Sequence, residues 1–490
     1  MLILLSVLLA LFLLGQLRCL TMTVLGVLWR PRALACAPPC AVMPTVCVQL
    51  PVYREEAVLD QLLTAARSIE YPDNLLSIVV IDDSNGPAQE EAAAICARHS
   101  AEDARVSYFH RDDRVGYKAG ALNYSDARTK AELLAVFDAD FVPDPQFLLK
   151  TVAHFAEPQV AAVQTRWTYR NADAPLTLLQ AAIFEAVFSF ECVVRTRLGV
   201  PALFMGTSGV WRRAAIESVG GWREVPFTAE DVDLSYRATN AGYRVAYVHE
   251  ALSSCEATDS FLAFKNQQRR WARGIFQASA DNAAGVLRVP HGLLASLLDT
   301  SVLALQLSMP SVLLLQALTA TMVFIGQARS QLWLHEQVAL SVLLVLMPVG
   351  FQLMLGQRLL HEDWLRRALL LLRSFALGVG LSVAVWAGLL DVLFRSRQEF
   401  VRTPKQGGTG LVAGNHRSWL RFSLVGAVVE GFLALLGGAA SVLALARGYT
   451  EALVPLLLLT AGAGGACAAS VREAAREWRR RSRSVVAVVA

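Results

Sequence analysis

Residues 132–143 read ELLAVFDADFVP, an apolar run that ends in two acidic side chains, Asp138 and Asp140. Residues 75–83, LLSIVVIDD, show the same arrangement and end in a second pair of aspartates. Short apolar runs of this kind are typical of buried strands. In an open α/β sheet, ligands bind in the crevice outside the carboxyl ends of the strands. We therefore expect both acidic pairs to line one binding site.

Segments of strand type and helix type alternate through the polar part of the chain. This alternation predicts an α/β domain with a mostly parallel, doubly wound sheet. The expected strands are 46–52, 75–83, 106–112 and 132–140, and the expected helices are 55–69, 88–99 and 121–131.

The composition is that of an integral membrane protein. Of the 490 residues, 54% are hydrophobic and 18% are charged. The mean hydropathy of +0.42 is too high for an ordinary soluble enzyme. The small net charge of +4 does not indicate a nucleic-acid partner. The eight cysteines form no metal-binding pattern, so we expect free thiols in a reducing cytosol.

Basic residues beside apolar runs predict the membrane topology. Residues 2–29 are apolar and are followed by Arg30 and Arg32, which places the N-terminus outside and these arginines in the cytoplasm. The basic stretches 395–405 and 472–483 should also be cytoplasmic. An even number of crossings must therefore separate the polar domain from residue 395.

Six later apolar stretches supply the remaining crossings. They are 292–309, which ends at Pro310, then 311–328, 338–356, 368–394, 420–446 and 450–470. Two crossings before residue 395, at 311–328 and 338–356, give five spans in all, with 292–309 and 368–394 lying at the interface. Four crossings also satisfy parity, but they place the arginines of 358–367 outside.

These patterns divide the chain into seven parts. We expect a transmembrane helix at 1–30, a linker at 31–44, the α/β domain at 45–290, interfacial and transmembrane helices at 291–394, a cytoplasmic loop at 395–418, two transmembrane helices at 419–471 and a basic cytoplasmic tail at 472–490.

The Asp-Ala-Asp sequence is a candidate metal site. In an extended strand, Asp138 and Asp140 would project to the same side. Two carboxylates with room for water suit Mg²⁺ or Mn²⁺ bridging a diphosphate. The alternative is a pair of solvated aspartates on a loop.

Two further motifs carry candidate chemistry. Glu230 and Asp231 can supply a carboxylate base, which sugar transfer needs to take the proton of an acceptor hydroxyl; acidic residues are also common in a first helical turn for dipole reasons. In residues 267–271, QQRRW, arginine offers a fork for diphosphate oxygens and Trp271 a flat face for a sugar ring. A basic-aromatic cluster before a membrane segment can instead be an interfacial anchor.

Glycine-rich stretches accompany these motifs. Lys118 lies between two glycines in GYKAGALN, where it could hold a phosphate at a helix N-terminus, although the P-loop spacing is absent. Gly206, in FMGTSGVWRR, suggests either a close backbone approach to a ligand or a tight turn.

In this order, the motifs resemble those of processive family 2 glycosyltransferases of the cellulose synthase superfamily. The family's D, DxD, ED and QxxRW series corresponds to Asp82/Asp83, Asp138-Ala139-Asp140, Glu230-Asp231 and residues 267–271. GYKAGAL, VQTRW, GTSGVWRRAAIESVGGW and EDVDLSYRA are similar in particular to the mannan-synthase-like (cellulose synthase-like A) branch and its bacterial relatives. The resemblance covers most of residues 46–280.

Two positions depart from the family's usual pattern. Phe400–Lys405 is similar to the FxVTxK gating loop, with Arg402 where valine is usual. Ala229 replaces the usual threonine before Glu-Asp, which removes a hydroxyl near the acceptor but keeps the base.

The resemblance implies a GT-A, Rossmann-like cytoplasmic domain, an α-helical transmembrane channel region and a set of residue roles. It implies that Asp82 contacts the nucleotide base, Asp140 the metal, Gln267 and Arg270 the diphosphate and Trp271 the acceptor sugar, with Asp231 as the general base. It further places Pro51, Tyr53, Glu55, Asp83, Lys118, Asp138, Thr403 and Lys405 with the donor, Glu230 beside the base, and Gly206 and Thr207 with the acceptor.

The expected function is that of an inverting, processive β-glycosyltransferase of the plasma (inner) membrane. It would polymerise hexose from UDP-glucose or GDP-mannose with Mg²⁺ or Mn²⁺ and extrude the product. Its partners would be the nucleotide-sugar, the growing polysaccharide and the lipid bilayer, with accessory export proteins or a second copy of the chain left open.

Two alternatives remain. One is a non-processive transferase acting on a lipid-linked or membrane acceptor. The other is a non-enzymatic transporter with a nucleotide-sensing domain, which the few intramembrane charges, mainly Asp299 and Glu430, disfavour.

Overall fold

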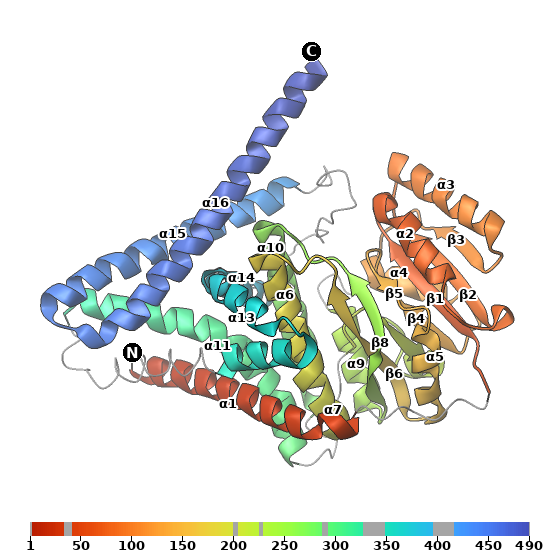
Figure 1. The fold of residues 1–490 in the computed structure, drawn as a ribbon, viewed down its shortest axis with the longest axis horizontal. Coiled ribbons are helices and arrows are strands. Elements are labelled where there is room, and N and C mark those ends of the chain that lie inside the picture. Colours follow the sequence, from red (N-terminus) through yellow and green to blue (C-terminus); the bar gives the residue numbers. More distant parts are fainter. Residues whose placement is uncertain are drawn as a thin grey trace.

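Figure 1 shows the protein in a computed structural model, which describes residues 2–33, 42–198, 204–224, 229–286, 293–326, 348–394 and 416–489. An α/β domain lies on one side and long helices lie on the other, with α6, α10, α13 and α14 between them (Figure 1). The expected combination of an α/β domain with a helical membrane region is confirmed.

The α/β domain is built on one sheet of eight strands in the order β3-β2-β1-β4-β7-β6-β8-β5. β1 to β4 pair in parallel, and β6 pairs in parallel with β8. β7 runs antiparallel to both β4 and β6, and the short β5 runs antiparallel to β8. The strands are β1 Val46–Val52, β2 Leu76–Asp82, β3 Val106–His110, β4 Leu133–Val136, β5 Val142–Pro143, β6 Val160–Tyr169, β7 Gly209–Arg212 and β8 Arg244–Cys255.

Helices cover both faces of this sheet, which explains why its strands are apolar without alternation. In β4, for example, Leu133 packs into one buried cluster and Leu134 into the other. The helices of the domain are α2 Glu56–Arg67, α3 Pro87–Glu102, α4 Tyr117–Asp126, α5 Phe147–Thr151, α8 Arg213–Ser218 and α9 Glu230–Asn240, with short 3₁₀ turns at Asp73–Leu75 and Val152–Ala156.

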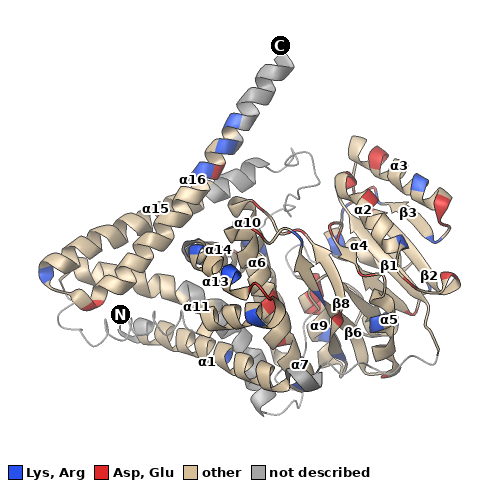
Figure 2. Cartoon of the chain, in the orientation of Figure 1, with Lys and Arg blue, Asp and Glu red and all other residues tan. Residues whose placement is uncertain are grey.

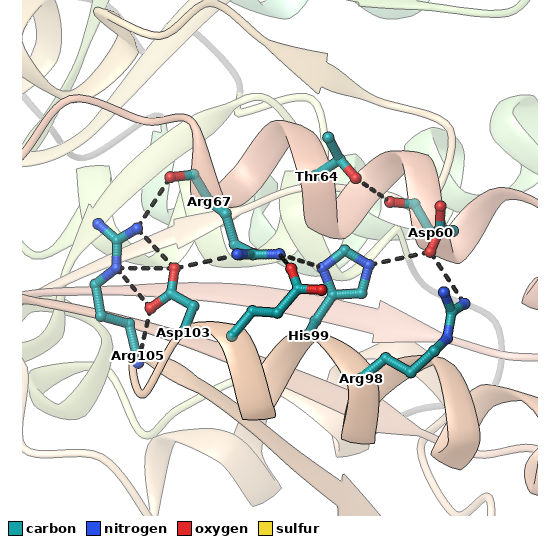
Figure 3. A network of polar contacts seen from close by, with 8 residues as sticks. Asp60, Thr64, Arg67, Arg98, His99, Asp103 and Arg105 are labelled. Atoms are coloured by element: carbon teal, nitrogen blue, oxygen red, sulfur yellow. Dashed lines mark hydrogen bonds and ion pairs between the residues drawn. The ribbon is translucent and has the colours of Figure 1, made fainter.

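A polar network joins the outer helices α2 and α3 (Figure 3). His99 lies between Arg67, which is 3.0 Å from its Nδ1, and Asp60, which is 3.1 Å from its Nε2. Arginine has only donors, so Nδ1 accepts and Nε2 carries the hydrogen that Asp60 receives. Arg67 also pairs with Glu102 and Asp103. These contacts fix the two helices to each other far along the sheet from β7 and β8.

The membrane region consists of long apolar helices with few charges (Figure 2). Within the part of the chain that the structure describes, four helical segments are long and apolar enough to cross a bilayer, namely Ser6–Trp29, Pro175–Leu198, Leu424–Arg447 and Thr450–Arg476. The chain is therefore a multi-pass membrane protein. Residues 175–198 are mostly buried within the protein, where they contact α1, β6 and α13.

The helices of this region and of its boundary with the α/β domain follow in chain order. They are α1 Leu2–Ala33, α6 Pro175–Ala186, the π-helical turn η3 Val187–Glu191, α7 Cys192–Leu198, α10 Phe261–Val286, α11 Leu293–Phe324, a helix at 348–360, α13 Trp364–Arg373, α14 Phe375–Leu393, α15 His416–Arg447, the 3₁₀ turn Thr450–Ala452 and α16 Leu453–Val489.

Some expected boundaries differ in the structure. The expected break at Pro310 does not occur, because α11 continues through it and packs along α1. Neighbouring helices allow a proline inside a membrane helix to be tolerated. The expected stretch 368–394 is divided at Ser374 between α13 and α14. Most of the expected linker 31–44, the first part of 338–356 and nearly all of 395–418 lie outside the described residues.

The local expectations in the α/β domain agree better with the structure. The four expected strands form as β1 to β4, and the helices expected at 55–69 and 88–99 form as α2 and α3. The helix expected at 121–131 begins earlier, at Tyr117, and ends at Asp126. The cysteines within the described ranges are all free thiols.

Candidate functional site

The aspartates at the end of β2 are buried and bound to protein groups. Asp82 is fully buried and accepts hydrogen bonds from the Ser84 backbone N–H (2.8 Å) and the Tyr108 hydroxyl (2.9 Å). Asp83 pairs with Arg111 through both carboxylate oxygens, at 2.7 and 2.6 Å. Burial raises the pKa of Asp83, although Arg111 opposes that shift. Both side chains order the sheet end, and their contact with a nucleotide stays a prediction.

Three non-glycine residues near this sheet end have a left-handed backbone. They are Arg54 after β1 (φ 54°), Tyr117 at the start of α4 (φ 50°) and Ser208 before β7 (φ 52°), the only such residues in the described ranges. Each such conformation costs about 1–3 kcal/mol and persists where surrounding contacts enforce it, which is typical of functional sites. Nothing in the residue types signals this strain.

A cation–aromatic stack occupies the same loops. The Arg114 guanidinium lies 3.4 Å from the ring centroid of Tyr53 and 4.9 Å from that of Tyr117. Burial lowers the pKa of Arg114, while nearby Tyr53 and Asp83 raise it. Tyr53 was expected in the site from the sequence, but Arg114 was missed. Of the other residues expected at this edge, Pro51 lies in β1 and Glu55 precedes α2.

Lys118 joins three segments at the centre of the candidate site. Its Nζ donates to Asp138 Oδ1 (2.5 Å) and to the Gly206 carbonyl (2.7 Å). The Asp138 backbone N–H donates to Thr207 Oγ1 at 2.9 Å. Burial alone would lower the pKa of Lys118, but Asp138, Glu230 and Asp231 raise it overall. The structure therefore brings the predicted lysine, glycine, threonine and carboxylates together.

The two carboxylates of the Asp-Ala-Asp sequence differ in exposure. They lie on a turn after β4, closed by a 3.0 Å hydrogen bond from the Phe141 N–H to the Asp138 carbonyl, and not on an extended strand. The Asp138 side chain is 38% exposed, whereas Asp140 is buried. The assumption of an extended backbone for this pair is therefore wrong, because the strand ends at Val136.

Asp231, in the first turn of α9, has a raised pKa. Burial and the neighbouring Glu230 raise the pKa of Asp231 to about 7, although Lys118 lowers it. Gly206 lies directly against it: a Cβ at that glycine would be 3.0 Å from Asp231 Oδ2. The positive φ of 81° at Gly206 independently favours glycine there. Asp231 is therefore a carboxylate that changes protonation near neutral pH.

α10 presents the QQRRW sequence to these carboxylates. Burial lowers the pKa of Arg270, whereas the negative charges of Glu230, Asp138 and Asp231 raise it. The Arg270 guanidinium therefore lies in the electrostatic field of these three carboxylates. Trp271 contacts Phe184 of α6 edge to face, with ring centroids 5.7 Å apart. Gln267 is half-buried on the same helix. The remaining expected residues, Thr403 and Lys405, lie outside the described ranges.

Comparisons with known proteins show which proteins the chain is similar to. Residues 133–356 match the family model described as "Glycosyl transferase family group 2". Glucomannan 4-beta-mannosyltransferase 7 of Arabidopsis thaliana is 39% identical over 237 residues, which cover 47% of this chain and 42% of the relative. The probable glucomannan 4-beta-mannosyltransferase 9 of Oryza sativa subsp. japonica is 36% identical over 240 residues, 48% of this chain and 45% of the relative. The chain thus matches a little under half the length of these curated relatives.

A solved structure supports the fold. The mannosyltransferase PcManGT from Pyrobaculum calidifontis, in complex with GDP-Man and Mn²⁺, matches with a TM-score of 0.54 and 18% identity, over 80% of this chain and 100% of that one. The GT-A type of sheet implied by the motifs is confirmed by this match. At this identity the likeness concerns the fold alone.

Proposed function

We propose that this chain, whose residues 133–356 match the family 2 glycosyltransferase model, is an inverting β-mannosyltransferase that builds a β-1,4-linked glycan from GDP-mannose. The curated relatives that it resembles are named as glucomannan 4-beta-mannosyltransferases, which favours GDP-mannose over UDP-glucose. The observation that carries the proposal is the cluster around Asp231, where a carboxylate with a pKa of about 7 lies among Lys118, Arg270 and the Asp138 turn.

Asp231 acts as the general base. It takes the proton of an acceptor hydroxyl while that oxygen forms a bond to the anomeric carbon of mannose. The bond between this carbon and the diphosphate oxygen breaks, GDP leaves with the electron pair, and the configuration inverts. A base with a pKa near the working pH is effective, because it is both ionised and basic.

Cationic side chains receive the departing diphosphate. Arg270 presents a planar fork that suits phosphate oxygens, and its surroundings of Glu230, Asp231 and Asp138 place it within the cluster. Lys118 adds a point charge on the other side of the turn. Gln267, on the same helix, joins Arg270 in this role. Of the other expected donor residues, Asp82 and Asp83 hold the loop at which the guanine base of the nucleotide would bind. Tyr53 lies beside them.

Asp138 and Asp140 would hold Mg²⁺ or Mn²⁺. Such ions take one or two carboxylates, several waters and substrate phosphate oxygens, and two carboxylates on one turn fit this demand. Among the residues described, no group of three or more His, Cys, Asp or Glu forms a metal site alone, so donor phosphates would complete the coordination. Bound there, the ion would neutralise charge on the diphosphate.

The acceptor end lies toward the membrane helices. Trp271 offers a ring face, Gly206 lies directly against Asp231, and Thr207 beside it accepts a hydrogen bond from the Asp138 backbone. The growing glycan would leave through the apolar helices, in a plasma (inner) membrane with the α/β domain in the cytoplasm. Thr403 and Lys405 would contact bound donor from a cytoplasmic loop that lies outside the described residues.

The test is an assay of membranes that contain the chain, supplied with radiolabelled GDP-mannose or UDP-glucose and with Mg²⁺ or Mn²⁺. We expect label from GDP-mannose in a polymer that linkage analysis reports as 4-linked mannose, and no incorporation after EDTA. Transfer only from UDP-glucose would overturn the donor assignment. Products of one or two sugars on a lipid would replace the processive reaction with the non-processive one.

A further inference from the structure

One face of α10 is tied by charged side chains to α14, α15 and α16, three helices of the membrane region and its boundary. Arg269 donates two hydrogen bonds to Asp391 of α14, at 2.6 and 2.7 Å. Lys265 pairs with Glu430 of α15 at 2.5 Å, and both side chains are fully buried. The carboxylate of Glu473 on α16 accepts from the Phe261 N–H (2.9 Å) at the start of α10. These three contacts define the membrane-side face of α10.

The spacing of these residues makes the face continuous. Phe261, Lys265 and Arg269 follow each other at intervals of four, so they lie on one side of the helix. At about 3.6 residues per turn, Arg270 and Trp271 lie toward the other side. α10 therefore carries its membrane contacts and its candidate site residues on different faces.

The opposite face is held against the candidate site. A Cβ at Gly274 would lie 2.8 Å from the Ala229 backbone nitrogen, directly before Glu230 and Asp231. Farther along, Asn282 donates to the buried Asp233 of α9 at 3.2 Å. Any shift or rotation of α10 therefore changes where Arg270 lies relative to the carboxylates of α9.

The Arg269 contact is the one best placed to control this geometry. Arg269 precedes Arg270 directly, and its ion pair with Asp391 is largely buried, with side-chain exposures of 14% and 7%. α14 also approaches α10 at backbone distance, since a Cβ at Gly388 would lie 2.5 Å from the Arg269 carbonyl oxygen. A planar fork held by two hydrogen bonds fixes orientation as well as distance.

We propose that Arg269 and Asp391 are positioning residues, through which the apolar helix α14 sets the place of Arg270 and Trp271 in the candidate site. This inference rests on the proposed mannosyltransferase function, because the effect is measured on GDP-mannose. Both residues act through the orientation of α10. The coupling makes the donor contact depend on a helix of the membrane region.

The test compares the full-length protein in detergent or nanodiscs with its Asp391→Asn and Arg269→Lys variants. We expect Asp391→Asn to raise both KM for GDP-mannose and Kd for GDP about tenfold, as when one charge-assisted contact to a ligand is weakened, with kcat changed much less. Arg269→Lys keeps the charge but loses the fork, so its effect should be intermediate. The charge-exchanged pair, Arg269→Asp with Asp391→Arg, should recover much of the loss.

A matched control breaks another contact between a membrane helix and the protein. Glu191 pairs with Arg18 of α1 and Arg195 of α7, and this group does not involve α10. Glu191→Gln should lower thermal stability but leave KM and Kd for GDP unchanged. If the Asp391→Asn and Arg269→Lys variants keep the wild-type KM and Kd, this inference is wrong, but the proposed function is not affected. A wild-type protein that neither binds GDP nor uses GDP-mannose would overturn the proposed function and this inference with it.

Discussion

The α2–α3 network and the membrane-side face of α10 both join helices through ion pairs, but their surroundings differ. In the α2–α3 network the side chains of Asp60, Arg98 and Glu102 are 56%, 66% and 66% exposed. On α10, Lys265 and its partner Glu430 are both 0% exposed. Water screens the outer pairs of the first network, such as Arg98 with Asp60, whereas the Lys265–Glu430 pair lies among apolar helices.

This difference determines what each network can contribute. Exposed ion pairs typically contribute about 0–1 kcal/mol each. A buried pair adds little over an apolar pair of the same shape, but removal of one partner leaves an uncompensated charge. The α10 contacts are therefore better suited to fixing one arrangement of helices than to raising stability, and the exposed pairs of the α2–α3 network do neither strongly.

The largest effect should come from breaking the buried pair. Glu430→Ala leaves the Lys265 ammonium among apolar helices, which should lower the free energy of unfolding by about 3–5 kcal/mol. Thermal unfolding of the detergent-solubilised protein measures this change. The double variant Lys265→Met/Glu430→Leu should recover most of the loss. If Glu430→Ala is as stable as the wild type, the pair does not hold α10.

A change of pH should have a smaller effect, on the rate of transfer. It should act at the candidate site, which holds the carboxylate assigned as the base. The active form of Asp231 is the charged one, and burial raises its pKa to about 7. We expect kcat/KM for GDP-mannose to fall about tenfold per pH unit below pH 7 and to level off above it. The α2–α3 network should not alter this profile. A rate that is constant from pH 5 to pH 8 would exclude Asp231 as the base.

The smallest effect should come from the exposed network. Arg98→Ala removes the contact to Asp60, and because both side chains are exposed it should cost about 1 kcal/mol or less. The transfer rate and KM should stay at wild-type values, which kinetic assays on membranes can check. A loss comparable to that of Glu430→Ala would mean that exposure does not separate the two networks.

The sequence predicted the elements whose signals are local. The apolar runs before Asp82 and Asp138 indicated β2 and β4 because both faces of these strands are buried. Pro310 gave a wrong prediction of a helix end. The packing of neighbouring helices, and not local propensity, decides whether a membrane helix continues. The two antiparallel strands, β5 and β7, depend on pairing between distant segments, which local patterns do not show.

The candidate site was predictable as a set of residues but not as a geometry. The motifs named Lys118, Asp138, Gly206 and Asp231, and the structure brings these four together. The stack of Arg114 on Tyr53 and the pairing of Arg269 with a residue over a hundred positions away have no local signature. They arise only from tertiary packing.

The assignment of Asp231 as the base is tested most directly by Asp231→Asn. An amide keeps the shape of the side chain but cannot take a proton. We expect the purified variant to bind GDP with wild-type affinity and to transfer mannose from GDP-mannose about 10²–10⁴-fold more slowly. Near-normal transfer by Asp231→Asn, with GDP binding intact, would contradict the account.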